Sequence, residues 1–195
     1  MPLYVGAPKN FSVQNLLANA DPKKGPSGTG WAYSESRICP DGYSDCSYAA
    51  KGSGAELTRP IGDSTGTEIK PTLNNTHKYY FAAWLYQNSQ NGSFDFYWPV
   101  AEPSVLSGAT AVSGQWTKVS AVVNRSSFSS GSQSCRIDYN NPSSEYLYIS
   151  GLVLVDLTAT FGSGTEPDKA WCDEHIAFSR NAQTVSRSVA RLVAT

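Results

Sequence analysis

The side chains best placed for chemistry in this chain are the aromatic rings of two neighbouring segments. Residues 78–87 read KYYFAAWLYQ and residues 93–100 read SFDFYWPV. Alternate side chains of a strand point to opposite faces, so rings of one parity share a face. Tyr and Trp combine an apolar ring with a polar tip, which suits stacking on sugar rings beside amide and carboxylate groups. The predicted carbohydrate-binding residues are Tyr80, Trp84, Tyr86, Tyr97, Asn88 and Asp95.

Structural packing is the alternative explanation for the same aromatic residues. Tyr and Trp are also enriched in subunit interfaces, and a second layer of the fold would bury them. Trp116, which follows Gly114 at the start of another predicted strand, is assigned to packing. The sequence therefore leaves two roles open for each ring, sugar contact or packing.

The spacing of the acidic residues does not indicate a catalytic pair. A glycosidase needs two carboxylates placed across a sugar bond. The pairs available are Asp95 with Asp138 or with Glu145, and nothing in their spacing requires them to meet. His175 ends a predicted short helix, where a cationic ring suits the negative end of the helix dipole. We predict a protein that is not an enzyme and keep a glycan-cleaving enzyme as an alternative.

The cysteines and histidines do not predict a zinc site. The four cysteines contain no CxxC pair, and His77 and His175 are isolated in the sequence. Cys39 and Cys46 flank a loop that they could bridge, but reduced thiols are the default expectation without a signal peptide. The turn 162–164, Gly-Ser-Gly, precedes a helix without a following Lys-Ser/Thr, so it is read as a tight connection and not as a phosphate loop.

Composition limits the classes of partner. The chain has 195 residues, enough for one domain with tails, and a net charge of −1 with 16% charged residues. This balance predicts no nucleic-acid partner. No apolar stretch approaches the roughly 20 residues of a membrane span, so membrane insertion is not expected. The start, MPLYVGAPKN, does not have the basic-then-apolar pattern of a signal peptide.

Short strands separated by Gly, Ser and Asn turns predict an all-β fold. Residues 115–123 alternate: Thr117, Val119, Ala121 and Val123 lie on one face, and Trp116, Lys118 and Ser120 lie on the other. Segments 78–87 and 93–100 read as an antiparallel hairpin. A long strand follows at 146–157, and its predicted inner face is Leu147, Ile149, Val153 and Val155. Eight or so such strands indicate an antiparallel β-sandwich, specifically a jelly roll, with one short helix after the last strand.

The segment 151–176, GLVLVDLTATFGSGTEPDKAWCDEHI, carries a family resemblance. Its final strand, DLTATFG turn, EP pair and WCD-containing helix resemble tail and minor structural proteins of phages and prophages. In those proteins the segment closes a galactose-binding-like jelly roll similar to carbohydrate-binding modules. The resemblance also implies a structural Ca²⁺ near the first and last strands, for which Asp21 and Asp156 are the candidate ligands.

The resemblance and the pattern together predict three parts and a function. They are an N-terminal arm (1–14), a jelly-roll domain (15–176) and a C-terminal tail (177–195), in which Val185, Val189 and Leu192 have helical spacing. We expect a non-enzymatic phage virion protein of a tail, baseplate, fibre or surface decoration, assembled in the bacterial host cytoplasm and released by lysis. Its expected partners are other virion proteins, further copies of itself through the arm and tail, and a host surface glycan. A free carbohydrate-binding module is the first alternative.

Overall fold

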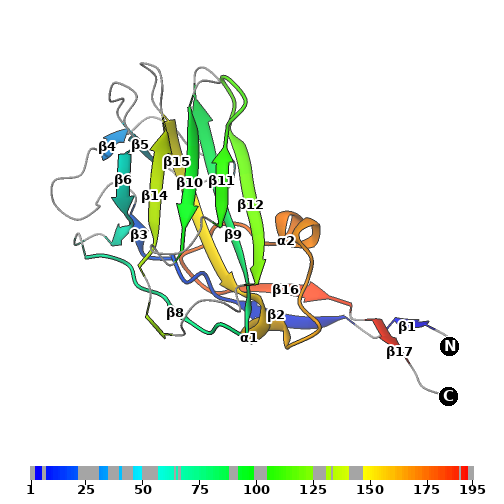
Figure 1. Cartoon of the computed structure of the whole chain (residues 1–195). Helices are drawn as coiled ribbons and strands as arrows, with labels where there is room; N and C mark the ends of the chain where they lie inside the picture. Colours follow the sequence, from blue (N-terminus) through cyan, green and yellow to red (C-terminus); the bar gives the residue numbers. More distant parts are fainter. Residues whose placement is uncertain are drawn as a thin grey trace.

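The protein is described by a computed structural model of the chain (Figure 1). The described residues are 3–5, 8–21, 31–34, 40, 46–49, 57–63, 65, 67–87, 92–98, 105–124, 131–132, 134–140, 147–188 and 190–192. The first strands are β1 (Leu3–Val5), β2 (Lys9–Val13), β3 (Ala20–Asp21), β4 (Trp31–Ser34), β5 (Cys46–Ala49), β6 (Leu57–Pro60), β7 (Gly62–Asp63), β8 (Thr72–Leu73) and β9 (Lys78–Gln87). They are followed by β10 (Ser93–Tyr97), β11 (Leu106–Ala109), β12 (Thr117–Asn124), β13 (Gly131–Ser132), β14 (Arg136–Asn140), β15 (Leu147–Asp156), α1 (Leu157–Phe161), α2 (Lys169–His175), β16 (Gln183–Arg187) and β17 (Ala190–Leu192).

Two antiparallel sheets form a jelly-roll β-sandwich, as the sequence predicts. One sheet has the strand order β11-β10-β14-β6, and the other has the order β12-β9-β15-β5-β4. Between the sheets lies the main core, where Phe81 stacks on Phe96 at 3.8 Å between ring centroids. The apolar alternation of the strands produces this layer, because one face of each strand enters the core.

The hairpin predicted for 78–87 and 93–100 is wrong. β9 pairs with β12 and β15 in the five-stranded sheet, whereas β10 pairs with β11 and β14 in the four-stranded sheet. The two aromatic strands therefore face each other across the core. Both strands carry an inward apolar row, and the facing rows bury more apolar surface than a hairpin with one free face would.

A bulge changes the face of β15 halfway along the strand. Its register against β9 shifts between Ser150 and Val153, and Gly151 has a φ of 59°. An extra residue in a strand moves every later side chain to the opposite face. Ile149 lies in the core between the sheets, as predicted, but Val153 and Val155 lie on the outer face.

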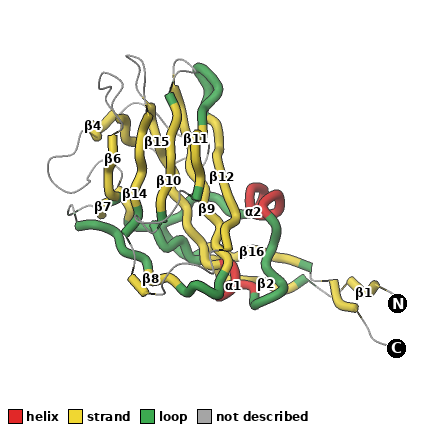
Figure 2. The backbone as a smooth tube through the Cα atoms, in the orientation of Figure 1, coloured by secondary structure: helices red, strands yellow, loops and turns green. Residues whose placement is uncertain are grey.

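The outer face of the five-stranded sheet has its own apolar layer at one end. Phe11, Phe161 and Val185 pack there over Val153 and its neighbours. Figure 2 shows both helices (red) on the side of the molecule where β2 and β16 run. Two short helices follow β15 instead of the single one predicted, because Asp156 caps α1 and Asp168 caps α2.

The helix considered for the tail is not formed, because the described part of residues 177–195 contains the strands β16 and β17 instead. β16 pairs with β2, and β17 pairs with β1, so the two ends of the chain run side by side (Figure 1). In β16 only Val185 is buried, and it pairs with Phe11 across the ladder. A strand buries alternate residues by pairing with the arm, whereas a lone short helix would gain no such partner.

Candidate functional site

The outer face of the five-stranded sheet is covered at one end and carries partly exposed rings at the other. The covered end includes Tyr80, which has no exposed surface and whose hydroxyl donates to Asp173 of α2 at 2.9 Å. Lys118 marks the border between the two ends. Its ammonium donates to the backbone carbonyls of Asp173 (2.9 Å) and Ile176 (3.2 Å) at the end of α2. Beyond this border Trp84 and Tyr86 are partly exposed.

Four aromatic residues gather beyond the border, and we call them the outer aromatic cluster: Trp84, Tyr86, Trp116 and Tyr148. Tyr86 and Tyr148 are direct cross-strand partners on β9 and β15. The Tyr86 ring lies 5.9 Å from the Tyr148 ring and 5.7 Å from the Trp116 ring, centroid to centroid. Each of the four side chains is partly exposed. The cluster thus forms a row of rings across three adjacent strands with Trp84 beside it.

Only two of the predicted site residues belong to the outer aromatic cluster, and the other described ones lie elsewhere. Trp84 and Tyr86 belong to it. Tyr80 does not, because α2 buries it. Tyr97 and Asp95 lie in the four-stranded sheet on the other side of the core. Asn88 lies outside the described residues.

Sequence reasoning missed Tyr148 and assigned Trp116 to packing only. The alternation of residues 115–123 had placed Trp116 and Lys118 on one face correctly, since Val119 and Val123 pack on the core between the sheets. What the sequence lacked was the strand order. Trp116 and Tyr148 meet the rings of β9 only because β12 and β15 flank that strand.

The carboxylates of the enzyme alternative do meet, but their carboxyl groups are engaged. Asp95 lies opposite Asp138 on β10 and β14. The backbone N–H of Gly108 donates to Asp95 at 2.6 Å, and the guanidinium of Arg136 lies 2.9 Å from the Asp138 carboxylate. The Asp138 side chain has no exposed surface, and an acid–base catalyst must reach its substrate. Glu145 lies outside the described residues.

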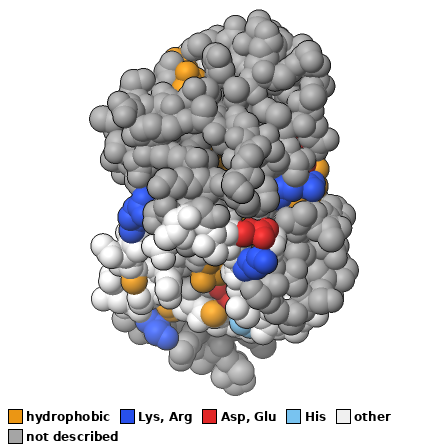
Figure 3. Space-filling model, turned by 90° about the vertical axis from the view of Figure 1, so that its left-hand side faces the viewer, with side chains coloured by type: hydrophobic (Ala, Val, Ile, Leu, Met, Phe, Trp, Pro, Cys, Tyr) orange, Lys and Arg blue, Asp and Glu red, His pale blue; other side chains and the backbone are white. Residues whose placement is uncertain are grey.

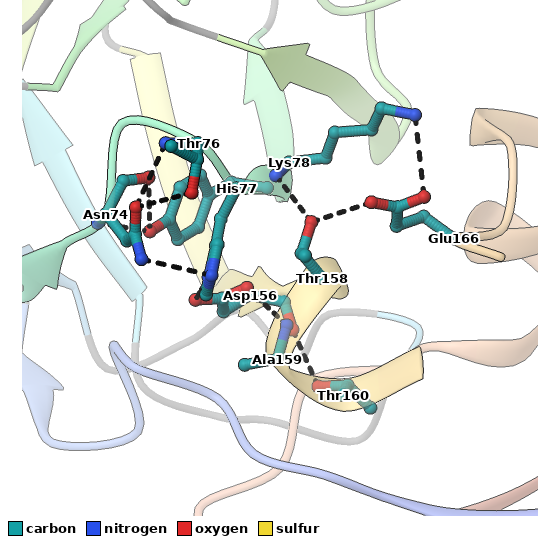
Figure 4. A network of polar contacts seen from close by, with 10 residues as sticks. Asn74, Thr76, His77, Lys78, Asp156, Thr158, Ala159, Thr160 and Glu166 are labelled. Atoms are coloured by element: carbon teal, nitrogen blue, oxygen red, sulfur yellow. Dashed lines mark hydrogen bonds and ion pairs between the residues drawn. The ribbon is translucent and has the colours of Figure 1, made fainter. Parts of the chain in front are cut away.

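Asp156, a predicted calcium ligand, caps a helix and pairs with a histidine. Its Oδ1 accepts from the Ala159 backbone N–H at 2.8 Å, and its Oδ2 lies 2.8 Å from Nδ1 of His77 (Figure 4). Among the described residues no group of three or more His, Cys, Asp or Glu is arranged to hold a metal ion. The side chain of Asp21 lies outside the described residues, so its pairing with Asp156 in a calcium site stays a prediction.

The same polar network ties α1 to the segment before α2. Thr158 accepts from the Lys78 backbone N–H at 2.9 Å and donates to Glu166 at 2.8 Å (Figure 4). Burial alone would raise the pKa of Glu166, but hydrogen bonds from its own backbone N–H and Thr158, with the charge of Lys78, lower it below its usual value. The network therefore holds α1, the start of β9 and the segment before α2 together.

The thiols of Cys135 and Cys172 are buried and poor nucleophiles. Cys135 and Cys172 are free cysteines. Burial, with the nearby charges of Asp173 and Asp168, raises the pKa of Cys172 to about 12, so the nucleophilic thiolate is scarce. The bridge considered for Cys39 and Cys46 lies outside the described side chains.

On the side drawn in Figure 3, acidic side chains lie beside a basic one at one place and other basic side chains lie apart, so neither sign forms a continuous patch among the coloured residues. None of the described helices is both long enough and apolar enough to cross a bilayer.

Comparison with known proteins finds solved structures that resemble this one at low sequence identity. No family model matches the chain, and no curated protein matches it. Among solved structures it is similar to a family 16 carbohydrate-binding module, with 14% identity, a TM-score of 0.46, and 67% of this chain and 88% of that one covered. A second is the family 6 module of Cellvibrio mixtus lichenase 5A in complex with cellotriose, with 16% identity, a TM-score of 0.45, and 70% and 95% covered.

A third similar structure is the CBM22-1 xylan-binding domain from Paenibacillus barcinonensis. Its identity is 9% and its TM-score 0.45, with 74% of this chain and 95% of that one covered. At such distances the assignment of the fold rests on the strand pairing of this chain itself, and the candidate site rests on its own geometry.

Proposed function

We propose that this protein binds carbohydrate through the outer aromatic cluster and catalyses no reaction. The observation that carries the proposal is the row of partly exposed rings Tyr148, Tyr86 and Trp116, which crosses the half of the sheet beyond α2. A core would bury such rings completely, as it buries Phe81 and Phe96. Rings with an apolar face and a polar tip suit sugars, which also have apolar faces and hydroxyl edges.

The direction of the row indicates how a glycan would lie. Lys118 and α2 bound the cluster along the strands, whereas the three rings extend across the strands. The Tyr86 ring is inclined by 59° to Trp116 and by 76° to Tyr148, so the row does not form a flat surface. We therefore expect a soluble oligosaccharide that crosses the sheet to bind better than a flat, crystalline polysaccharide surface.

A glycan array followed by titration of the best glycan, monitored by tryptophan fluorescence, tests the proposal. Trp116→Ala and Tyr148→Ala should each weaken binding at least about tenfold, because truncating a central aromatic contact commonly costs about 1.4 kcal/mol or more. Tyr97→Ala is the matched control, because this partly exposed tyrosine lies in the other sheet. Equal losses in all three variants, or no glycan bound by the intact chain, would contradict the proposal.

A structural role in a phage virion is the second candidate, and the free binding module is its rival. The observation that favours the virion role is the β1–β17 ribbon, in which both ends of the chain pair and extend from the sandwich (Figure 1). A free module has no need of such a ribbon, whereas an assembled protein uses extended ends to contact its neighbours. The resemblance of segment 151–176 to phage structural proteins supports the same role and the same location.

Light scattering of the purified chain separates these candidates. A virion component should form a defined oligomer that loses subunits when the ribbon is removed. A monomer at every concentration, with intact glycan binding, would favour the free module. Glycan cleavage products on incubation with the bound sugar would favour the enzyme alternative instead.

A further inference from the structure

A groove of about 550 Å³ runs along β2, and none of the residues of β16, the strand that pairs with β2, lines it. One wall is the strand itself, and the other is formed by Asp156, Ala159 and Thr160 of the β15–α1 junction and by Thr72 of β8. The groove is separate from the outer aromatic cluster, and none of its lining residues belongs to that cluster.

The backbone edge of β2 lines this groove. Residues of both parities contribute to it, from Lys9 and Phe11 to Asn10 and Ser12. Only an edge presents consecutive residues, because a face presents alternate ones. Among the described residues β2 pairs with β16 alone, and no backbone hydrogen bond reaches its second edge. A free strand edge beside a groove is a site where an extended segment can add as a further strand.

Among the described strands, β1 and β17 form a ribbon that pairs with no further strand. β1 and β17 pair only with each other among the described strands, over three residues each, and extend beyond the sandwich (Figure 1). A two-stranded ribbon alone is marginally stable in water. Among the described residues, no backbone hydrogen bond reaches the outer edges of this ribbon, as none reaches the second edge of β2.

We propose that the β1–β17 ribbon of a second copy of this chain enters the groove and pairs with the open edge of β2. Such pairing would extend the β16–β2 ladder and would cover the open edge of β2 together with one edge of the ribbon. Because ribbon and groove are different surfaces, the contact is heterologous, and a closed ring or a mutual exchange satisfies every copy. The inference deepens the assembly role proposed above and does not depend on carbohydrate binding.

Filling the groove tests the proposal. Ala159 is exposed on the groove wall, so Ala159→Trp should occupy the space without touching the β2–β16 ladder. Ala170→Trp is the matched control, because Ala170 is an exposed alanine on α2 outside the groove. Light scattering is expected to give an oligomer for the intact chain and the control, and a monomer for Ala159→Trp. A monomeric intact chain, or an oligomer unchanged by Ala159→Trp, would overturn the proposal.

A complementation experiment guards against a variant that merely misfolds. A chain without residues 1–5 and 190–195 keeps the groove and lacks the ribbon, whereas Ala159→Trp keeps the ribbon and lacks the groove. Each should be monomeric alone, and an equimolar mixture should form a heterodimer. No heterodimer, with both chains folded by circular dichroism, would overturn the proposal. Glycan binding by these monomers would continue unchanged, so the two proposals fail independently.

Discussion

At the scale of single residues, Asn15 hydrogen-bonds to β15 beyond Ser150, where the pairing of β15 with β5 ends. Its side-chain amide donates to the Leu152 carbonyl at 2.9 Å and accepts from the Leu154 backbone N–H at 2.9 Å. The same oxygen accepts from the Leu17 N–H at 3.0 Å. One side chain therefore replaces the backbone of a neighbouring strand along this stretch of β15.

Asn15→Ala should destabilise the fold by about 2 kcal/mol or more. It leaves at least two buried backbone groups unpaired, and each such group costs roughly 1–3 kcal/mol. Urea unfolding measures the loss, with the exposed Asn10→Ala as control. A loss as small as that of the control would show that water replaces the amide.

At the scale of elements, Asp173 attaches α2 to the sheet. Its carboxylate accepts hydrogen bonds from Tyr80 of β9 and from Lys169 of α2. Burial opposes the charge of Asp173, but hydrogen bonds from Lys169, Ser120 and Tyr80 outweigh it and lower its pKa below the usual value of 3.8. The carboxylate is therefore more favourable in the folded state than in the unfolded one. The stabilisation by the Asp173 carboxylate is complete above the pKa of the unfolded state. It is lost as pH falls through the lower pKa of the folded state.

The free energy of unfolding should accordingly fall below about pH 4, and Asp173→Asn should reduce the size of that fall. Glu166, whose pKa is also lowered, accounts for part of the remainder. Urea titrations at several pH values measure both. Glu174→Gln is the control, because the Glu174 side chain is 77% exposed. An acid loss identical in Asp173→Asn and the control would contradict this account.

At the scale of the whole molecule, the two ends of the chain belong to the fold as well as to its surface. β16 covers part of the outer apolar layer, and the partly buried Phe178 packs there too. The division into an arm (1–14), a domain (15–176) and a tail (177–195) stays a prediction, while β2 and β16 pair with each other and contribute to this layer.

Truncation should reveal this division. Deleting residues 177–195 removes Val185 and the partly buried Phe178 from the layer and should cost roughly 2 kcal/mol or more, because full burial of one such side chain contributes about 1.5–3 kcal/mol. Deleting only 189–195 removes β17 and should leave stability nearly unchanged. Thermal unfolding compares the two. Equal stability of both truncated chains would mean that the sandwich does not need β16.

The sequence alone determined the fold class, because alternation and turn residues are local properties. It predicted strands near 78–87, 115–123 and 146–157, and placed Trp116 and Lys118 on the correct face. It also identified Trp84 and Tyr86 as candidate rings, since aromatic density needs no knowledge of neighbours.

Only the tertiary structure decided which rings are partly exposed together on one face. Tyr80 is buried because Asp173, 93 residues away, brings α2 over it. Tyr97 lies apart because β10 joins the other sheet, and Tyr148 lies beside Tyr86 because strand order sets neighbours. Exposure and sheet partners depend on segments far apart in the chain, whereas strand alternation depends only on adjacent residues.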